Sequence, residues 1–120
     1  MKPLFVQYAK CGTCQKAAKW LKANGIEVES RDIITQNPTR EELERWIPAS
    51  SLPVNKFFNT SGVRYKELQL KEVVKSAPSE ELIKLLASEG KLVKRPVLVV
   101  GEKVLVGFKE EEWSALLLTK

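Results

Sequence analysis

Two kinds of hydrophobic spacing alternate near the start of the chain. Residues 4–8, with the sequence LFVQY, form a short apolar run that is typical of a β-strand. From Thr13 or Cys14 onward, apolar residues recur at helical intervals until the stop signal Asn24-Gly25; they are Ala17, Ala18 and Leu21. Residues 26–33 then alternate apolar and polar side chains, the period of a half-buried strand. This pattern predicts a βαβ unit.

The middle of the chain has helical spacing and no strand period. Thr39, with Glu42 three residues later, is a capping-box signature for a helix that stops near Pro48; its apolar residues are Leu43, Trp46 and Ile47. Residues 53–70 are interpreted as short helices, with a helix end and a turn at 57–62. A further helix runs from Pro78-Ser79 to Glu89-Gly90 and turns Leu82, Ile83, Leu85 and Leu86 toward a core. Residues 38–90 are therefore predicted to be a helical insertion.

The C-terminal part returns to strand spacing. Residues 97–100 and 103–106 are runs rich in β-branched side chains, and Gly101-Glu102 between them has the length and chemistry of a tight hairpin. Residues 109–118 follow as a last helix with Trp113, Leu116 and Leu117 on its buried side. The order predicts an α/β fold in one domain over residues 1–120: a thioredoxin-like, mixed four-stranded sheet with the helical insertion between its βαβ half and its β-hairpin-α half.

Length and charge narrow the class of protein. The chain has 120 residues, 43% of them hydrophobic, which is enough for one domain with a real core. No apolar stretch approaches the roughly 18 to 20 residues that cross a bilayer, and residues 1–6 are too short for a signal peptide. A cytoplasmic location without membrane contact is expected. The net charge of +5 permits anionic partners, although acidic residues are interspersed and no DNA-binding stripe is present.

The chain's two cysteines are three residues apart, at Cys11 and Cys14, where the first strand gives way to the first helix. A helix N-terminus favours a thiolate, and no acidic residue precedes Glu27. We therefore expect a nucleophilic Cys11, with Cys14 one turn along to attack a bond formed there and close a disulfide. Thr13 and the backbone N–H groups from Gly12 to Cys14 are expected to hold an anion at the helix start. In a reducing compartment such a pair is more often catalytic than structural.

Two other interpretations of the cysteines stay open. Free cysteines often pack as small apolar residues, which would make the protein a thiol-inert structural or adaptor protein. A closed zinc site needs four ligands, whereas the chain has two cysteines and no histidine, so no metal is expected.

Arg95-Pro96 precedes the second β-branched run. A proline there leaves the strand ladder intact, and a trans peptide bond is its commoner state. The thioredoxin-like order favours a cis bond, which would turn this backbone toward the cysteine loop. The guanidinium fork of Arg95 suits an oxyanion in charge and geometry, the alternative being a surface ion pair.

Taken together, several segments resemble the ArsC/Spx family of arsenate-reductase-like proteins over nearly the whole chain. They are YAKCGTCQKA at 8–17, NPTREEL at 37–43, FFNTSG at 57–62, KRPV at 94–97 and VGF at 106–108. The resemblance implies a thioredoxin-like fold in which Cys11 attacks arsenate and Arg95 holds the oxyanion. It also implies no bound cofactor, with glutathione and a glutaredoxin or thioredoxin-type protein as the external reductant.

Departures from that family pattern bear on the activity. Relative to glutathione-linked arsenate reductases, Asn59 and Gly107 stand where two further arginines hold the oxyanion, and Arg64 lies near without aligning. Gln15 replaces another arginine, and Cys14 replaces a serine. Two lost charged hydrogen bonds, each worth about 1.5 to 3 kcal/mol, would reduce arsenate turnover about 100-fold or more.

The Spx branch shares the C-x-x-C motif and regulates transcription by binding the C-terminal domain of the RNA polymerase α subunit. This chain lacks the basic C-terminal extension of that branch, and residues 49–53 contain no glycine at the position of the polymerase contact. The sequence thus predicts a cytoplasmic thiol-disulfide oxidoreductase that acts on a small oxyanion or disulfide. An Spx-like redox-sensing regulator is the alternative.

Overall fold

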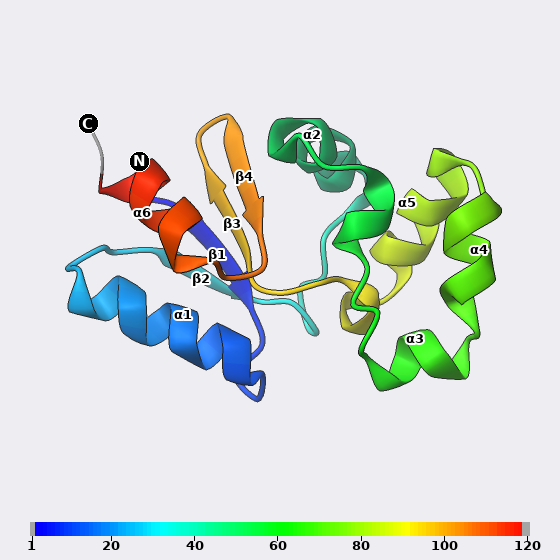
Figure 1. Cartoon of the computed structure of the whole chain (residues 1–120), viewed down its shortest axis with the longest axis horizontal. Coiled ribbons are helices and arrows are strands. Elements are labelled where there is room, and N and C mark those ends of the chain that lie inside the picture. The colour runs from blue at the N-terminus through cyan, green and yellow to red at the C-terminus, as the bar shows by residue number, and fades with distance from the viewer. Residues whose placement is uncertain (1, 119–120) are drawn as a thin grey trace.

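A computed structural model describes residues 2–118 (Figure 1). The N-terminal half of the sheet is built from β1 (Leu4–Gln7), α1 (Gly12–Ala23) and β2 (Glu29–Asp32). The insertion follows as α2 (Arg40–Ser50), the 3-10 helix η1 (Val54–Phe57), α3 (Val63–Glu67), α4 (Leu70–Ser76), α5 (Ser79–Ser88) and the 3-10 helix η2 (Gly90–Leu92). The chain then forms β3 (Val97–Val100), β4 (Lys103–Val106) and α6 (Glu110–Leu117).

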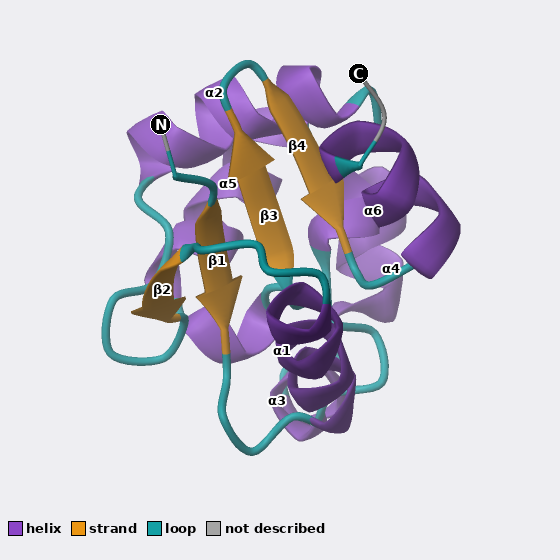
Figure 2. Ribbon diagram, turned by 90° about the vertical axis from the view of Figure 1, so that its left-hand side faces the viewer, coloured by secondary structure: helices purple, strands orange, loops and turns teal. Residues whose placement is uncertain are grey.

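The four strands form one mixed sheet in the order β2-β1-β3-β4 (Figure 2). β1 runs parallel to β2 and antiparallel to β3, and β3 runs antiparallel to β4. Val100 pairs with Lys103 across a two-residue turn, where Gly101 has a φ of +57° that other residues rarely adopt. The predicted mixed four-stranded α/β fold, including this hairpin, is confirmed.

Helices cover both faces of the sheet, as Figure 1 shows. α1 and α6 lie on one face over an apolar cluster; its buried members are Phe5, Ala17, Leu21, Leu98 and Trp113. The insertion lies on the other face, where α2 packs against β4 and α5. The larger cluster on that face joins sheet residues such as Val6 and Val97 to insertion residues such as Leu43 and Phe57. The predicted helical insertion therefore supplies most of the helical side of the larger cluster.

The junction between β2 and α2 is held by a polar network. The Thr39 side chain accepts a hydrogen bond from the Glu42 backbone N–H, and the Glu42 carboxylate accepts one from the Thr39 N–H, which confirms the predicted capping box. The same carboxylate accepts two hydrogen bonds of 2.7 Å from the Arg31 guanidinium. Arg31 also lies over the Trp46 ring, 5.7 Å from its centroid. One edge strand is thereby tied to the first helix of the insertion.

A second attachment of the insertion depends on Gly90. This residue is buried beneath the backbone that follows β2, and a Cβ at this position would overlap the Ile33 carbonyl oxygen. Glycine is therefore required by close approach of two backbones rather than by an unusual φ.

Three sequence predictions about element limits are corrected. The strand expected at 26–33 is restricted to Glu29–Asp32, and the Ile26 N–H bonds instead to the Leu21 carbonyl, just after the end of α1. α1 begins at Gly12, one residue earlier than expected. α2 does not stop near Pro48 but continues to Ser50, because a proline in a last turn removes a single backbone hydrogen bond.

Some expected core residues lie partly or fully outside the core. Ala18 is exposed, because the buried stripe of α1 consists of Cys14, Ala17 and Leu21. Leu116 and Leu117 are only half-buried, so that Trp113 is the buried residue of α6. Within residues 2–118, no helix combines the length and apolar character needed to cross a lipid bilayer.

Candidate functional site

The two cysteines lie where β1 ends and α1 begins. Cys11 is the N-cap of α1, with an extended backbone, and its N–H donates to the Tyr8 carbonyl at 2.9 Å. Cys14 lies on the buried face of the first turn, and its Sγ accepts a hydrogen bond of 3.4 Å from the Tyr8 N–H. Both cysteines are free thiols, Cys11 half-buried and Cys14 1% exposed. The placement of Cys11 at the head of the helix agrees with the sequence prediction.

The surroundings of Cys11 favour its thiolate. Burial opposes ionisation, but it is outweighed by hydrogen bonds from the Cys14 backbone N–H, the Cys14 thiol and Arg95, so that the pKa of Cys11 falls below its ordinary value. The Thr13 backbone N–H adds a smaller contribution in the same direction. A thiolate is the reactive form of cysteine, and Cys11 therefore has the electrostatics of a nucleophile.

Cys14 has the opposite environment. Burial, together with the hydrogen bond and negative charge of Cys11, raises the pKa of the Cys14 thiol to about 12, against the lowering effects of the Tyr8 N–H and the Arg95 charge. The proton of the pair is thus kept on Cys14 while Cys11 ionises. This division gives the two sulfurs different roles, one as a nucleophile and one as a proton donor toward it.

Arg95 approaches this pair from the segment just before β3. The Arg95-Pro96 peptide bond is cis, as the fold argument predicts. The guanidinium carbon lies 5.1 Å from the centroid of the Tyr8 ring, and the positively charged guanidinium helps to lower the pKa of Cys11. Its Nη1 is buried without a hydrogen-bond partner, the one such side-chain atom among residues 2–118. A buried donor left unpaired costs free energy, so this N–H marks Arg95 as a residue whose hydrogen bonds are incomplete in the structure.

A cavity of about 350 Å³ opens beside these groups, and we call it the thiol cavity. Its lining residues are Cys11, Thr13, Asn59, Ser61, Lys94, Arg95, Val106, Gly107, Phe108 and Lys109. No acidic side chain lines it among the described residues, whereas two lysines do. The cavity therefore combines a nucleophilic sulfur with a positive potential suited to an anionic substrate.

Three of the six site residues expected from the sequence, Cys11, Thr13 and Arg95, line this cavity, whereas Cys14, Gly12 and Pro96 do not. Thr13 and Arg95 line it, and so do Asn59 and Gly107, the two positions where the family resemblance expects arginine. Gly12 does not line it; it is exposed as the first residue of α1. Pro96 lies next to the site residue Arg95.

Two residues singled out by the resemblance lie elsewhere. The Gln15 amide donates to the Ala9 carbonyl at 2.8 Å and braces the loop before Cys11. The Arg64 guanidinium forms an ion pair of 2.8 Å with Glu89 at a separate hollow, so Arg64 does not replace the missing oxyanion arginines.

Sequence reasoning missed Ser61 and two lysines of the thiol cavity. Lys94 precedes the expected Arg95, and Lys109 closely follows Gly107, so proximity in sequence to expected site residues was an available signal. Within residues 2–118 no group of three or more histidine, cysteine, aspartate or glutamate side chains is arranged as metal ligands.

The sequence of this chain matches the model of a known protein family. The ArsC family model matches residues 6–116, which include both cysteines and Arg95. The chain belongs to the ArsC family. The cysteine loop and the cis Arg95-Pro96 segment both lie within the matched residues, and the four-stranded sheet is the thioredoxin-like scaffold of the chain.

Three similar proteins illustrate the range of this family. The chain is 60% identical to the crystal structure of an ArsC family related protein from Bacteroides fragilis, with a TM-score of 0.94 over 97% of this chain and 98% of that one. It is 49% identical to the uncharacterized protein YusI of Bacillus subtilis (strain 168), over 92% of this chain and 93% of YusI. It is 32% identical to the regulatory protein MgsR of the same organism, over 90% of this chain and 84% of MgsR.

Proposed function

We propose that the protein is a thiol-disulfide oxidoreductase in which Cys11 is the nucleophile and Cys14 the resolving thiol. The observation that carries this proposal is the placement of Cys11 at the N-cap of α1, with Cys14 one turn along and Arg95 lining the same cavity as Cys11. A structural pair of apolar cysteines would not need a cationic donor with a buried, unpaired N–H beside the sulfur.

The reaction is written for a disulfide R–S–S–R′. The Cys11 thiolate attacks one sulfur, a Cys11–S–S–R bond forms, and R′–S⁻ leaves. Cys14 then gives its proton to the leaving thiolate or to water and attacks the Cys11 sulfur, which forms the Cys11–Cys14 disulfide and releases R–S⁻. The protein has lost two electrons and the substrate has become two thiols. Two molecules of glutathione, or a dithiol of the glutaredoxin or thioredoxin type, restore the pair by the reverse exchange.

The high pKa of Cys14 fits its place in this sequence of steps. While Cys11 is a thiolate, its charge and hydrogen bond help to keep the proton on Cys14. Once Cys11 is in a mixed disulfide that charge is gone, while Arg95 still favours a Cys14 thiolate. The second thiol is therefore activated by the first step, although burial continues to disfavour its ionisation.

Arsenate is the weaker substrate candidate. Of the arginines that the family uses to hold the oxyanion, Arg95 alone is in the cavity, with Asn59 and Gly107 at the other two positions. Lys94 and Lys109 add positive charge, but an ammonium group lacks the two-pronged geometry of a guanidinium. We therefore place disulfides before arsenate.

A redox-sensing regulator is the second candidate, because the regulatory protein MgsR is 32% identical over most of both chains. The same Cys11–Cys14 chemistry would then change a binding surface instead of turning over a substrate. The two candidates share the first oxidation of the cysteine pair and differ in the consequence of that oxidation.

Mass spectrometry of the protein after reaction with hydroxyethyl disulfide tests the proposal. We expect the native protein to lose two hydrogens as Cys11 and Cys14 pair, Cys14→Ser to retain a mixed disulfide on Cys11, and Cys11→Ser to do neither. Equal reaction of Cys11→Ser and the native protein would refute the proposal.

Two further assays separate the candidates. Arsenate turnover, coupled through glutathione, glutaredoxin and an NADPH-dependent reductase, must disappear in Cys11→Ser if the protein is an arsenate reductase. Binding to the isolated C-terminal domain of the RNA polymerase α subunit, in the reduced or the oxidised form, would instead identify a regulator.

A further inference from the structure

A second cavity of about 350 Å³ adjoins the thiol cavity, and we call it the lysine cavity. Its lining residues are Asn55, Lys56, Phe58, Asn59, Thr60, Ser61, Tyr65, Lys71, Val74, Lys75 and Lys94. Asn59, Ser61 and Lys94 line both cavities, so the two hollows share a wall. A substrate that extends from Cys11 past Lys94 would therefore meet the lysine cavity next.

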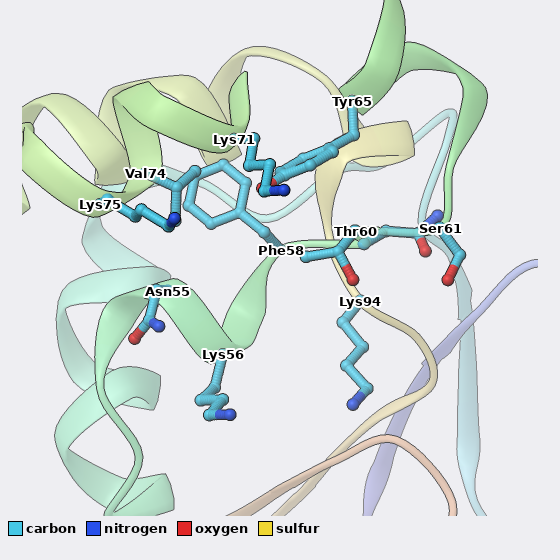
Figure 3. Close-up of a pocket in the computed structure, with 11 residues that line it drawn as sticks. Asn55, Lys56, Phe58, Thr60, Ser61, Tyr65, Lys71, Val74, Lys75 and Lys94 are labelled. Carbon is cyan, nitrogen blue, oxygen red and sulfur yellow. The ribbon is translucent and has the colours of Figure 1, made fainter. Parts of the chain in front are cut away.

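The charge around the lysine cavity is of one sign. Figure 3 shows Lys71 and Lys75 of α4 in the upper half of the view and Lys56 and Lys94 in the lower half. Within residues 2–118, none of these four lysines forms an ion pair, whereas Lys2, Lys84 and Lys109 do. Four uncompensated ammonium groups around one hollow repel each other, and an anion between them relieves that repulsion.

Two buried aromatic side chains that line the lysine cavity, Phe58 and Tyr65, strengthen this attraction. Phe58 and Tyr65 are 2% and 8% exposed, and their rings pack edge to face with centroids 6.3 Å apart. An apolar lining lowers the local dielectric constant, so charges beside it interact more strongly than they would in bulk water. Polar side chains of Asn55, Asn59 and Thr60 complete a wall that can donate hydrogen bonds.

We propose that the lysine cavity binds the negatively charged part of a low-molecular-weight disulfide whose sulfur reacts at Cys11. The substrate class is a disulfide that carries carboxylate or phosphate groups away from its sulfur. This inference rests on the proposed function, because it assigns a second binding subsite to the same reaction. It differs from an oxyanion held at the sulfur, since the charge is recognised by the insertion and not by the cysteine loop.

The experiment compares the rates at which three disulfides oxidise the Cys11–Cys14 pair. Hydroxyethyl disulfide is neutral, glutathione disulfide carries carboxylates, and coenzyme A disulfide carries phosphates. For each anionic probe we take the ratio of its second-order rate constant to that of the neutral probe. The test variant is Lys71→Gln with Lys75→Gln, and the control is Lys22→Gln with Lys103→Gln. The control loses the same charge at exposed positions that line neither cavity.

We expect the ratio for at least one anionic probe to fall about five-fold in the test variant, as two partly exposed ion pairs predict, and to stay within about two-fold in the control. The probe that responds distinguishes carboxylate from phosphate recognition. In the native protein, added salt should lower the ratio toward the value of the test variant.

Two results would overturn the inference. One is a ratio that falls equally in the test and control variants, which would mean that net charge alone steers the substrate. The other is a native ratio that is insensitive to salt and to both variants. Oxidation of the pair by hydroxyethyl disulfide would still support the proposed function in either case, whereas the absence of any Cys11–Cys14 oxidation would refute both.

Discussion

The Glu42 carboxylate accepts three hydrogen bonds at the β2–α2 junction, and Glu42→Gln removes its charge with little change in shape. The carboxylate accepts two hydrogen bonds of 2.7 Å from Arg31 and one of 3.0 Å from the Thr39 N–H. The Arg31 and Glu42 side chains are only 18% and 19% exposed, so solvent screens the pair weakly. Charge-assisted bonds of this kind contribute about 1.5 to 3 kcal/mol.

A loss of about 2 kcal/mol should lower the melting temperature of Glu42→Gln by about 8 °C for a domain of this size. Urea unfolding gives the free energy directly. The matched control is Glu81→Gln, whose carboxylate lies 3.8 Å from Lys84 with both side chains 58% exposed, and it should change stability by less than about 0.5 kcal/mol.

The pH dependence checks the cause. The hydrogen bonds from Arg31, opposed by burial and assisted by Thr39, lower the pKa of Glu42 below its ordinary value. A depressed carboxyl pKa contributes stability that is complete above the unfolded-state pKa and is lost as pH falls through the folded-state value. The gap between native protein and Glu42→Gln should therefore be constant near pH 7 and narrow below about pH 4. A gap that is the same at both pH values, or no larger than that of Glu81→Gln, would refute this reasoning.

Three further predictions concern packing and the resolving thiol. Gly90→Ala should lower the free energy of unfolding by about 1 to 3 kcal/mol in urea, because the added Cβ would overlap the Ile33 backbone. The control is Gly12→Ala, whose Cβ would meet no atom within 4 Å and should not lower stability. Equal losses of stability in the two variants would contradict this. Trp113→Phe should lower stability by about 1 to 3 kcal/mol, because a fully buried indole N–H donates to the Gly107 carbonyl at 3.1 Å; unchanged unfolding would contradict it. Alkylation followed by mass spectrometry should modify Cys14 only slowly below its pKa of about 12, and rapid native-state labelling of that thiol would disprove its assignment.

Elements set by local chemistry could be predicted from the sequence. The capping box of Thr39 and Glu42, the hairpin at Gly101-Glu102 and the strand runs on either side of it each depend on residues a few positions apart. The limits of elements were less predictable. Whether α2 stops at Pro48 depends on how the last turn is packed, because one missing N–H does not end a helix at its terminus.

The part of the candidate site near the cysteines could be predicted from the sequence, whereas the lysine cavity could not. Cys11, Thr13 and Arg95 were accessible from motif spacing, and the structure brings them together. The lysine cavity was not accessible, because its lysines come from η1, α4 and the segment before β3, which only the packing of the insertion assembles. Likewise, the pairing of Arg64 with Glu89 joins residues of different elements and cannot be inferred from spacing.

The central claim is that Cys11 is held as a thiolate by the helix start and Arg95. The most direct test measures the pH dependence of Cys11 alkylation by site-resolved mass spectrometry in the native protein and in Arg95→Met. We expect a midpoint for native Cys11 below the ordinary cysteine pKa, and a higher midpoint in the variant. A native midpoint at or above the ordinary value, or one that Arg95→Met leaves unmoved, would contradict it.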